Sequence, residues 1–192
     1  MIGIMNRRTR KIRIGVFCSA FCLFALAVSL PAHETGFPEH TLKNVFPKAT
    51  GFTLRKKTLS ADQIAKIEQA SESKVQHNDN PLSYYVALGK SSDGSGVLGT
   101  VVMVDTRGPK GALDLAVGIL RDGTVARVVV VANHDEPALS ADAFLKQIEG
   151  KNAQSLMTTG KNLHYSGDAK SAQAMVNAVR RALHLLAAAT AS

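Results

Sequence analysis

The chain has 192 residues, of which 45% are hydrophobic and 20% charged, and its formal net charge is +8. This composition predicts a globular core and excludes a predominantly disordered chain. Without five cations that precede the first acidic residue, the net charge falls to about +3, an ordinary surface charge that does not indicate a nucleic-acid partner. These cations are Arg7, Arg8, Arg10, Lys11 and Arg13.

The first 32 residues have the layout of a secretory signal peptide. A basic region ends at Arg13, an apolar run covers residues 14–30, and the predicted cleavage follows Ala32. The run is a little shorter than the roughly 20 residues of a spanning helix, and an uncleaved anchor stays open as the alternative. Because Cys18 and Cys22 both lie in this leader, the mature chain has no thiol for a disulfide or a metal. We expect a periplasmic protein, with the leader either removed or kept as a membrane anchor.

Residues 33–95 are predicted to be a lead-in with one helix and the first strand. A short amphipathic piece at residues 42–46 is expected to dock on the domain. Ser60, followed three residues later by Gln63, predicts the amino-terminal cap of the helix. Residues 84–88 are the first candidate strand.

The main domain is predicted over residues 96–188, beginning with strands at 96–104, 112–120 and 124–132. Asp122-Gly123 separates the last two runs and predicts a hairpin. Residues 128–131 are uniformly apolar, which predicts a central strand covered on both faces.

Two helices follow these strands. The first is predicted to start at Ser140 as its cap, to run through Ile148 and to close at Gly150. The second covers residues 170–188, and its predicted buried stripe consists of Met175, Val176, Val179, Leu183 and Leu186. The order of elements predicts an α+β fold, an antiparallel sheet covered by helices.

The turn before the final helix carries the residues with the clearest chemical meaning. Ser166-Gly167 leads directly into the helix, whose first N–H groups are unpaired and carry partial positive charge, an arrangement that suits a phosphate. Gly167 allows the backbone to approach such a group closely. Lys170 offers a cation and Ser171 a hydroxyl in the first turn. The structural alternatives are an ordinary cap at Ser166 and a solvated Lys170.

A second set of polar residues lies just past the last strand. His134 and Glu136 belong to a turn, where functional residues are often found. They could line a bound ligand, or they could belong to an ordinary polar turn before a helix. The residue types alone do not distinguish a ligand-binding turn from an ordinary polar turn.

Residues 166–179 resemble the flavin-attachment motif of the FMN-binding domain family, which occurs in extracytoplasmic subunits of Rnf and sodium-translocating NADH:quinone reductase complexes. That motif reads Asp-x-x-Ser/Thr-Gly-Ala-Thr, then x-Ser/Thr-Ser and an apolar helix. Residues 144–151 are also similar to the family's preceding Phe-Leu-x-Gln-Phe-x-Gly-Lys segment, and residues 134–137 to its polar turn. The likeness covers residues 96–186.

The resemblance implies an FMN-binding-domain-like fold with FMN held by its phosphate at the start of the final helix. The residues it assigns to the cofactor are Ser166, Gly167, Lys170, Ser171, Glu136 and His134. Ala169 stands where the family has the Thr that carries FMN through a phosphoester, so that linkage is chemically unavailable. Asp168 replaces the motif's Ala, and its carboxylate would compete with an anionic ligand. FMN is therefore expected to be noncovalent or atypically attached, with Ser171 as the atypical candidate.

These observations predict an exported FMN-binding electron-transfer protein whose partner is a membrane-bound redox protein or respiratory complex. The alternative is a flavin-free degenerate module of the same fold that acts as an interaction or assembly partner of a membrane redox system. Copper binding by His33 and His40 is a third hypothesis. No hydrolase or nucleotide-binding motif is visible, so no catalytic residue or metal ligand is assigned and enzymatic activity is left open.

Overall fold

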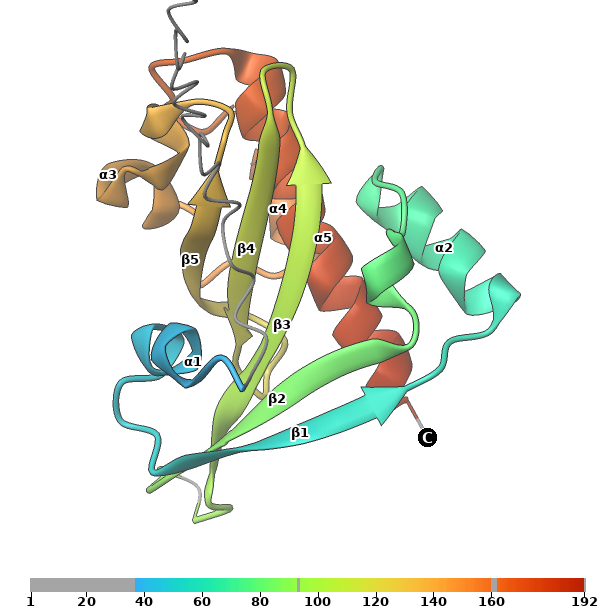
Figure 1. The fold of residues 1–192 in the computed structure, drawn as a ribbon, viewed down its shortest axis with the longest axis vertical. Helices are drawn as coiled ribbons and strands as arrows, with labels where there is room; N and C mark the ends of the chain where they lie inside the picture. Colours follow the sequence, from blue (N-terminus) through green and yellow to red (C-terminus); the bar gives the residue numbers. More distant parts are fainter. Residues whose placement is uncertain (1–36, 93, 160–161, 192) are drawn as a thin grey trace, which may run out of the picture. The chain divides into compact units, whose positions relative to one another are not determined.

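Five antiparallel strands form a sheet in the order β1-β2-β3-β4-β5, each pairing with the strand that follows it in the sequence (Figure 1). They are β1 (Gly51–Lys57), β2 (Leu82–Leu88), β3 (Val97–Arg107), β4 (Ala112–Ile119) and β5 (Val125–Asn133). The computed structural model describes residues 37–191 apart from 93 and 160–161. The predicted leader, Cys18, Cys22 and His33 lie outside the described residues.

The helices lie on both faces of this sheet. They are α1 (Glu39–Val45), α2 (Ala61–Ser71), α3 (Asp142–Leu145), α4 (Ala153–Thr159) and α5 (Ala169–Thr190), with the 3₁₀ turns η1 (His77–Asp79) and η2 (Pro137–Ser140). This architecture confirms the predicted α+β class with an antiparallel sheet covered by helices. The sheet continues across position 95, because β1 and β2 come from the predicted lead-in and β2 pairs with β3.

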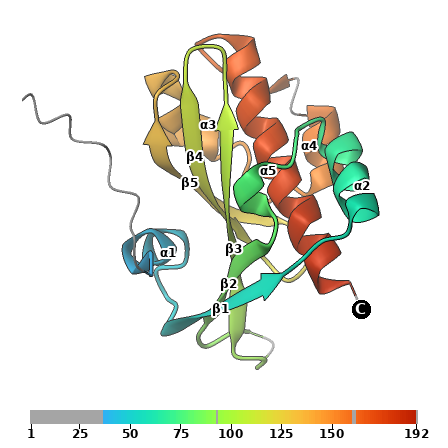
Figure 2. The same cartoon turned by 45° about the vertical axis from the view of Figure 1, so that its right-hand side comes forward.

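The long helix α5 packs on β3 and β4, and α2 lies against α5 (Figure 2). The predicted stripe of α5 faces the core: Met175, Val176 and Val179 are fully buried, and Leu183 is nearly so. Leu186 is only partly buried. The spacing of apolar residues along the sequence thus located the packed face of this helix. Among the described residues, no helix is long and apolar enough to cross a membrane.

On the opposite face, α1 packs against β4 and β5. Leu42 and Val45 of α1 and the adjacent Phe46 form the centre of a second hydrophobic cluster. Two glycines of the sheet allow α1 and Phe46 to lie close to the strands. A Cβ on Gly118 would overlap Val45, and a Cβ on Gly99 would overlap the ring of Phe46.

Two predicted local signals are confirmed. The Ser60 hydroxyl accepts a hydrogen bond from the Gln63 amide at 3.3 Å, and the Gln63 side chain accepts one from the Ser60 amide at 2.9 Å, which forms the predicted capping box of α2. At the β4–β5 hairpin Gly123 has a φ of +80°, a conformation that glycine adopts without strain. Both signals act within a few residues, which is why the sequence reveals them.

Two other predictions are wrong. Residues 128–131 do not form a central strand, because β5 lies at the edge of the sheet and Val131 is 46% exposed. Ser140 is not a helix cap, because it ends the turn that begins at Pro137, and Ala141 precedes the short α3 without a side-chain cap. In both cases tertiary position overrides a local pattern.

Two buried arginines join α5 to α2 and to the segment that follows α2. Arg181 is fully buried; its Nε lies 3.0 Å from Asp79 Oδ2, and its guanidinium also donates to Ser73 Oγ at 2.7 Å and to the Asp105 carbonyl. Arg180 donates to the Ala70 carbonyl. Burial raises the pKa of Asp79 because desolvation outweighs the attraction of Arg181. These contacts fix the position of α5 relative to the sheet.

Candidate functional site

The turn that leads into α5 is capped by the chain's own carboxylates. Asp168, not Ser166, is the cap residue of the helix: Asp168 Oδ1 accepts a hydrogen bond from the Lys170 amide at 2.8 Å. Ser166 and Gly167 precede the cap and are exposed. The residue at the position of the family's Ala thus supplies the side chain that satisfies the first turn.

Glu136 reaches this turn from the loop after β5. Its Oε2 accepts hydrogen bonds from the Asp168 amide at 2.9 Å and from the Tyr165 hydroxyl at 2.6 Å. Its Oε1 forms an ion pair with Lys110, which lies in the β3–β4 hairpin. Only 8% of Glu136 is exposed. The carboxylate of Glu136 therefore holds the anion position that the sequence assigned to a phosphate.

These hydrogen bonds shift the pKa values of Glu136 and Tyr165. The hydrogen bonds from Lys110, Tyr165 and the Asp168 amide lower the pKa of Glu136 from 4.5 to about 2. Desolvation and the nearby Glu136 carboxylate raise the pKa of the Tyr165 hydroxyl. Glu136 is therefore ionised and Tyr165 is a neutral donor throughout the physiological range.

The neighbouring Asp135 ties the same loop to the helix. Its Oδ1 accepts a hydrogen bond from Ser171 Oγ at 2.7 Å, and its Oδ2 accepts one from the Lys110 amide at 3.3 Å. Ser171 is fully buried, so the hydroxyl considered as an atypical attachment point faces protein rather than solvent. We call this group the Glu136 cluster; it consists of Lys110, Asp135, Glu136, Tyr165, Asp168 and Ser171.

Glycines make the close packing of the cluster possible. A Cβ on Gly167 would overlap Glu136 Oε2 and contact the Tyr165 ring. A Cβ on Gly108 would overlap the Asp135 carboxylate. The lack of a side chain at Gly167 thus allows the close approach of an anion, and this anion is the Glu136 carboxylate.

This geometry does not fit an FMN phosphate at the turn. The Asp168 and Lys170 amides already donate to carboxylates, and the carboxylate of Glu136 fills the space beside Gly167. The cluster holds three carboxylates, those of Asp135, Glu136 and Asp168, and the ammonium group of Lys110 already pairs with Glu136. A dianion entering here would lose hydrogen-bond donors to the resident carboxylates and be repelled by them.

A pocket of about 330 Å³ lies beside the turn. Phe144 and Tyr165 contribute aromatic rings, 4.8 Å apart between centroids, and Ser166 and His164 lie at its border. Its volume is at the lower end of the roughly 300–1,000 Å³ typical of ligand sites. Three alanines complete its lining.

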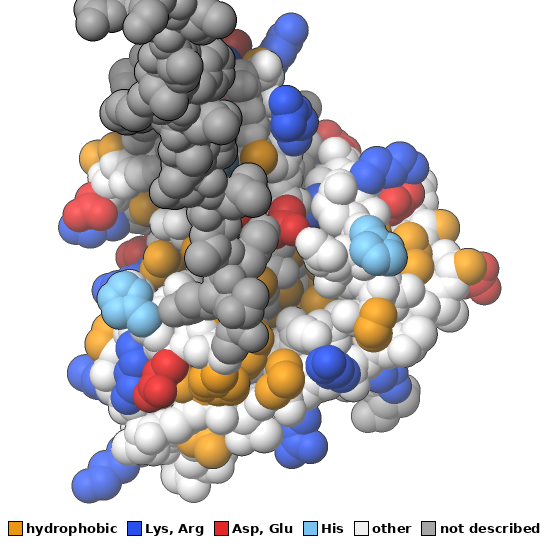
Figure 3. Space-filling view, in the orientation of Figure 1, with side chains coloured by type: hydrophobic (Ala, Val, Ile, Leu, Met, Phe, Trp, Pro, Cys, Tyr) orange, Lys and Arg blue, Asp and Glu red, His pale blue; other side chains and the backbone are white. Residues whose placement is uncertain are grey.

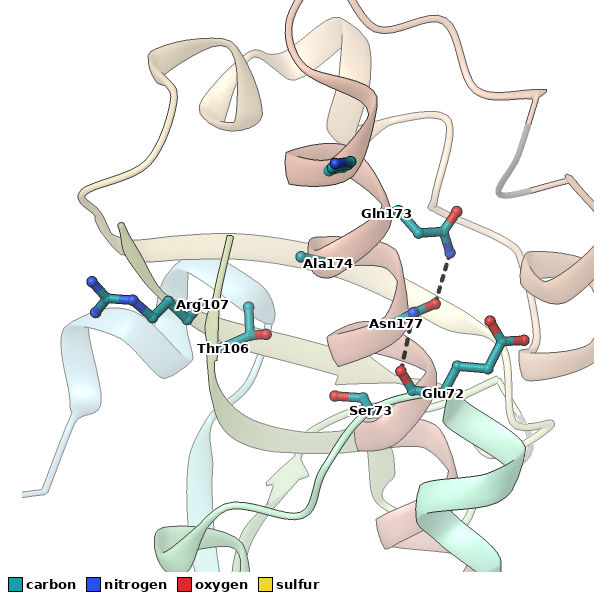
Figure 4. A pocket seen from close by; sticks show the side chains of 8 residues that line it. Glu72, Ser73, Thr106, Arg107, Gln173, Ala174 and Asn177 are labelled. Carbon is teal, nitrogen blue, oxygen red and sulfur yellow. Dashed lines mark hydrogen bonds between the residues drawn. The ribbon is translucent and has the colours of Figure 1, made fainter. Parts of the chain in front are cut away.

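A second pocket of about 330 Å³ lies between the first turns of α5, the end of β3 and the end of α2 (Figure 4). Some of its polar groups bind one another: Gln173 donates to Asn177 at 2.8 Å, and Asn177 donates to the Glu72 carbonyl at 3.2 Å. The side chain of Arg107 points away from α5 in this view. Lys170 lines this pocket rather than the Glu136 cluster.

Of the six residues assigned to a cofactor, the structure brings Glu136, Gly167 and Ser171 together. His134 is exposed, and its hydrogen-bonded contact to the sheet is made by its backbone amide. Sequence reasoning missed Lys110, Asp135 and Tyr165. Lys110 lies between Gly108 and Gly111 in a hairpin tip, which is a turn signal, but its ion pair spans 26 residues and no local pattern predicts it.

Among the described residues, no group of three or more His, Cys, Asp and Glu side chains is arranged to hold a metal ion. No model of a known protein family matches this chain, and a search of curated proteins finds no relative. The comparison with FMN-binding domains therefore rests on the motif residues alone.

Proposed function

We propose that this chain is a flavin-free module of the FMN-binding-domain type, exported to the periplasm, that acts as an interaction or assembly partner of a membrane redox system. The observation that supports this is the Glu136 carboxylate on the Asp168 amide. The anion that the helix start attracts is part of the chain itself. Ala169 adds to this, because it lacks the hydroxyl needed for a phosphoester.

A noncovalent FMN carrier is the second candidate, and the apolar pocket beside Ser166 favours it. The rings of Phe144 and Tyr165 would contact an isoalloxazine ring there. In that case the phosphate would lie outside the Glu136 cluster, and the cofactor would supply the redox chemistry while the protein positions it.

The test is the visible spectrum of the protein purified from its native host, before and after acid precipitation, followed by titration with FMN monitored by flavin fluorescence. We expect a colourless protein that leaves the fluorescence of added FMN unchanged. Yellow colour released by acid would establish the noncovalent carrier. Colour retained in the pellet would show a covalent site, and Ser171→Ala would then be the first variant to examine.

A pair of variants tests whether the carboxylate is what excludes the phosphate. Glu136→Ala should gain measurable affinity for inorganic phosphate or FMN, because the Asp168 amide and Lys110 lose their internal partner. Glu149→Ala is the matched control, since Glu149 pairs only distantly, at 3.9 Å, with Arg127. Equal phosphate binding by Glu136→Ala and Glu149→Ala would show that the Glu136 carboxylate is not what excludes a phosphate.

A further inference from the structure

Strand β1 is an open edge of the sheet. It pairs with β2 over residues 51–57, and among the described residues no strand pairs with its other side. In Figures 1 and 2 no helix covers this side of β1. An open edge presents unpaired N–H and C=O groups on which a further extended chain can form a ladder.

The side chains of this edge are basic. Arg55, Lys56 and Lys57 are all exposed, and within the described part of the chain none of them has an ion pair or side-chain hydrogen bond. Because side chains alternate along a strand, Arg55 and Lys57 lie on one face and Lys56 on the other. A segment paired with β1 would therefore meet cations on both of its faces.

Apolar side chains accompany these cations. Leu54 is 42% exposed, and its register partner on β2 is Tyr85. The ring of Phe37, 49% exposed, packs edge-on against Tyr85 with centroids 5.5 Å apart. Figure 3 shows hydrophobic side chains beside Lys and Arg side chains in the part of the molecule where β1 runs. We call β1 with Phe37 and Tyr85 the β1 edge.

We propose that the β1 edge is the docking site for an extended acidic segment of a partner protein, which pairs with β1 as a sixth strand. This inference rests on the proposed function, for which it names the surface and the chemistry of the partner. Backbone hydrogen bonds would supply the pairing, acidic side chains would meet Arg55, Lys56 and Lys57, and an apolar side chain would cover Leu54 and Phe37.

The charges also act against one use of an open edge. Two copies of this chain paired in parallel and in register through β1 would place Arg55, Lys56 and Lys57 opposite the same residues of the other copy, and like charges on adjacent strands are destabilising. The edge therefore disfavours this pairing with its own copy and favours a strand of opposite charge.

The experiment uses the purified protein and two eight-residue probe peptides, one alternating Glu with Val and one alternating Lys with Val. Amide chemical shifts and hydrogen exchange are recorded on titration with each peptide. The acidic peptide should shift and protect amides of β1, weakening as salt is added, and the basic peptide should not. Lys56→Glu/Lys57→Glu should lower the affinity for the acidic peptide by roughly tenfold.

The control is Lys66→Glu/Lys146→Glu, which changes the net charge equally at two exposed positions outside β1 and should bind the acidic peptide like the wild type. The proposal would be overturned if both peptides had equal effects, if the changes lay away from β1, or if two copies associated through β1. Binding of phosphatidylglycerol vesicles through Lys56 and Lys57, without an effect of the peptide, would also overturn it. Bound FMN would instead contradict the proposed function, so the two failures are distinguishable.

Discussion

At the scale of single residues, Glu136 connects its own loop to two parts of the chain that are distant in sequence. Its carboxylate contacts Lys110 in the β3–β4 hairpin, Tyr165 in the turn before α5 and the Asp168 amide at the start of α5. A carboxylate with this many donors is stabilised in its ionised form. Together with Asp135, which accepts a hydrogen bond from Ser171, this side chain holds the loop after β5 against the helix.

The low pKa of Glu136 makes part of the stability dependent on pH. A carboxylate whose pKa falls from 4.5 to about 2 on folding stabilises the native state above pH 4.5 and loses this contribution as the pH falls to 2. At pH 7 the wild type should melt a few degrees above Glu136→Gln. Thermal melts at pH 7, 4 and 2 should show the difference shrinking with acidity; a constant difference would contradict the assignment.

Gly167 is expected to be intolerant of a side chain because of its neighbours. Gly167→Ala places a Cβ against Glu136 and Tyr165 and should cost about 1–3 kcal/mol in the free energy of unfolding. The cost should fall in a Glu136→Ala background, a coupling that a double-mutant cycle measures. Gly51→Ala is the control, since its Cβ would meet no atom within 4 Å. Additive effects of the two substitutions would show that the overlap does not matter.

At the scale of elements, polar contacts hold α5 at its first turn and at its middle. Its first turn is bound by the Glu136 cluster, and its middle is joined through Arg180 and Arg181 to α2 and to the segment after α2. Both anchors are polar contacts at the border of an apolar interface. They determine where the helix lies, while the apolar stripe supplies most of the favourable free energy of its packing.

Arg181→Met should destabilise the protein by about 3–5 kcal/mol, because it leaves the Asp79 carboxylate buried without its cation. Adding Asp79→Leu should recover much of this loss. Arg180→Met should cost less, since the side chain of its partner Glu72 is 56% exposed. Denaturant unfolding measures all three, and an equal loss for both arginines would be inconsistent with the role of burial.

At the scale of the whole molecule, one sheet separates two hydrophobic clusters. The larger lies between the sheet and α5, and the smaller lies between the sheet and α1. Adjacent residues of β3, Val101 and Val102, belong to the smaller and the larger cluster respectively. Because both clusters share the same strands, neither is expected to melt alone.

Truncation of a buried side chain on either face of the sheet should therefore lower the midpoint of one unfolding transition that the whole molecule shares. Leu42→Ala and Met175→Ala remove fully buried side chains and should each cost about 2–5 kcal/mol with the denaturant m-value unchanged. Leu54→Ala, at a position 42% exposed, should change stability by less than about 0.5 kcal/mol. Two transitions for Leu42→Ala would show that α1 and its cluster unfold independently.

Local chemistry made much of the fold predictable. The capping box at Ser60, the Asp122-Gly123 turn and the apolar stripe around Met175 each depend on residues within about one helical turn or one hairpin. The backbone there responds to its immediate neighbours. Such signals were sufficient for the α+β class and for the strands from β2 to β5.

The tertiary structure alone decided the position of β5 at an edge, the role of Gly99 and Gly118 beneath α1, and the identity of the anion at the start of α5. The turn at Ser166-Gly167 predicted that an anion would lie there, and its neighbourhood includes Glu136, 32 residues away from the Asp168 amide that it binds. Contacts between distant segments depend on how the whole chain packs, and a single sequence carries no local trace of them.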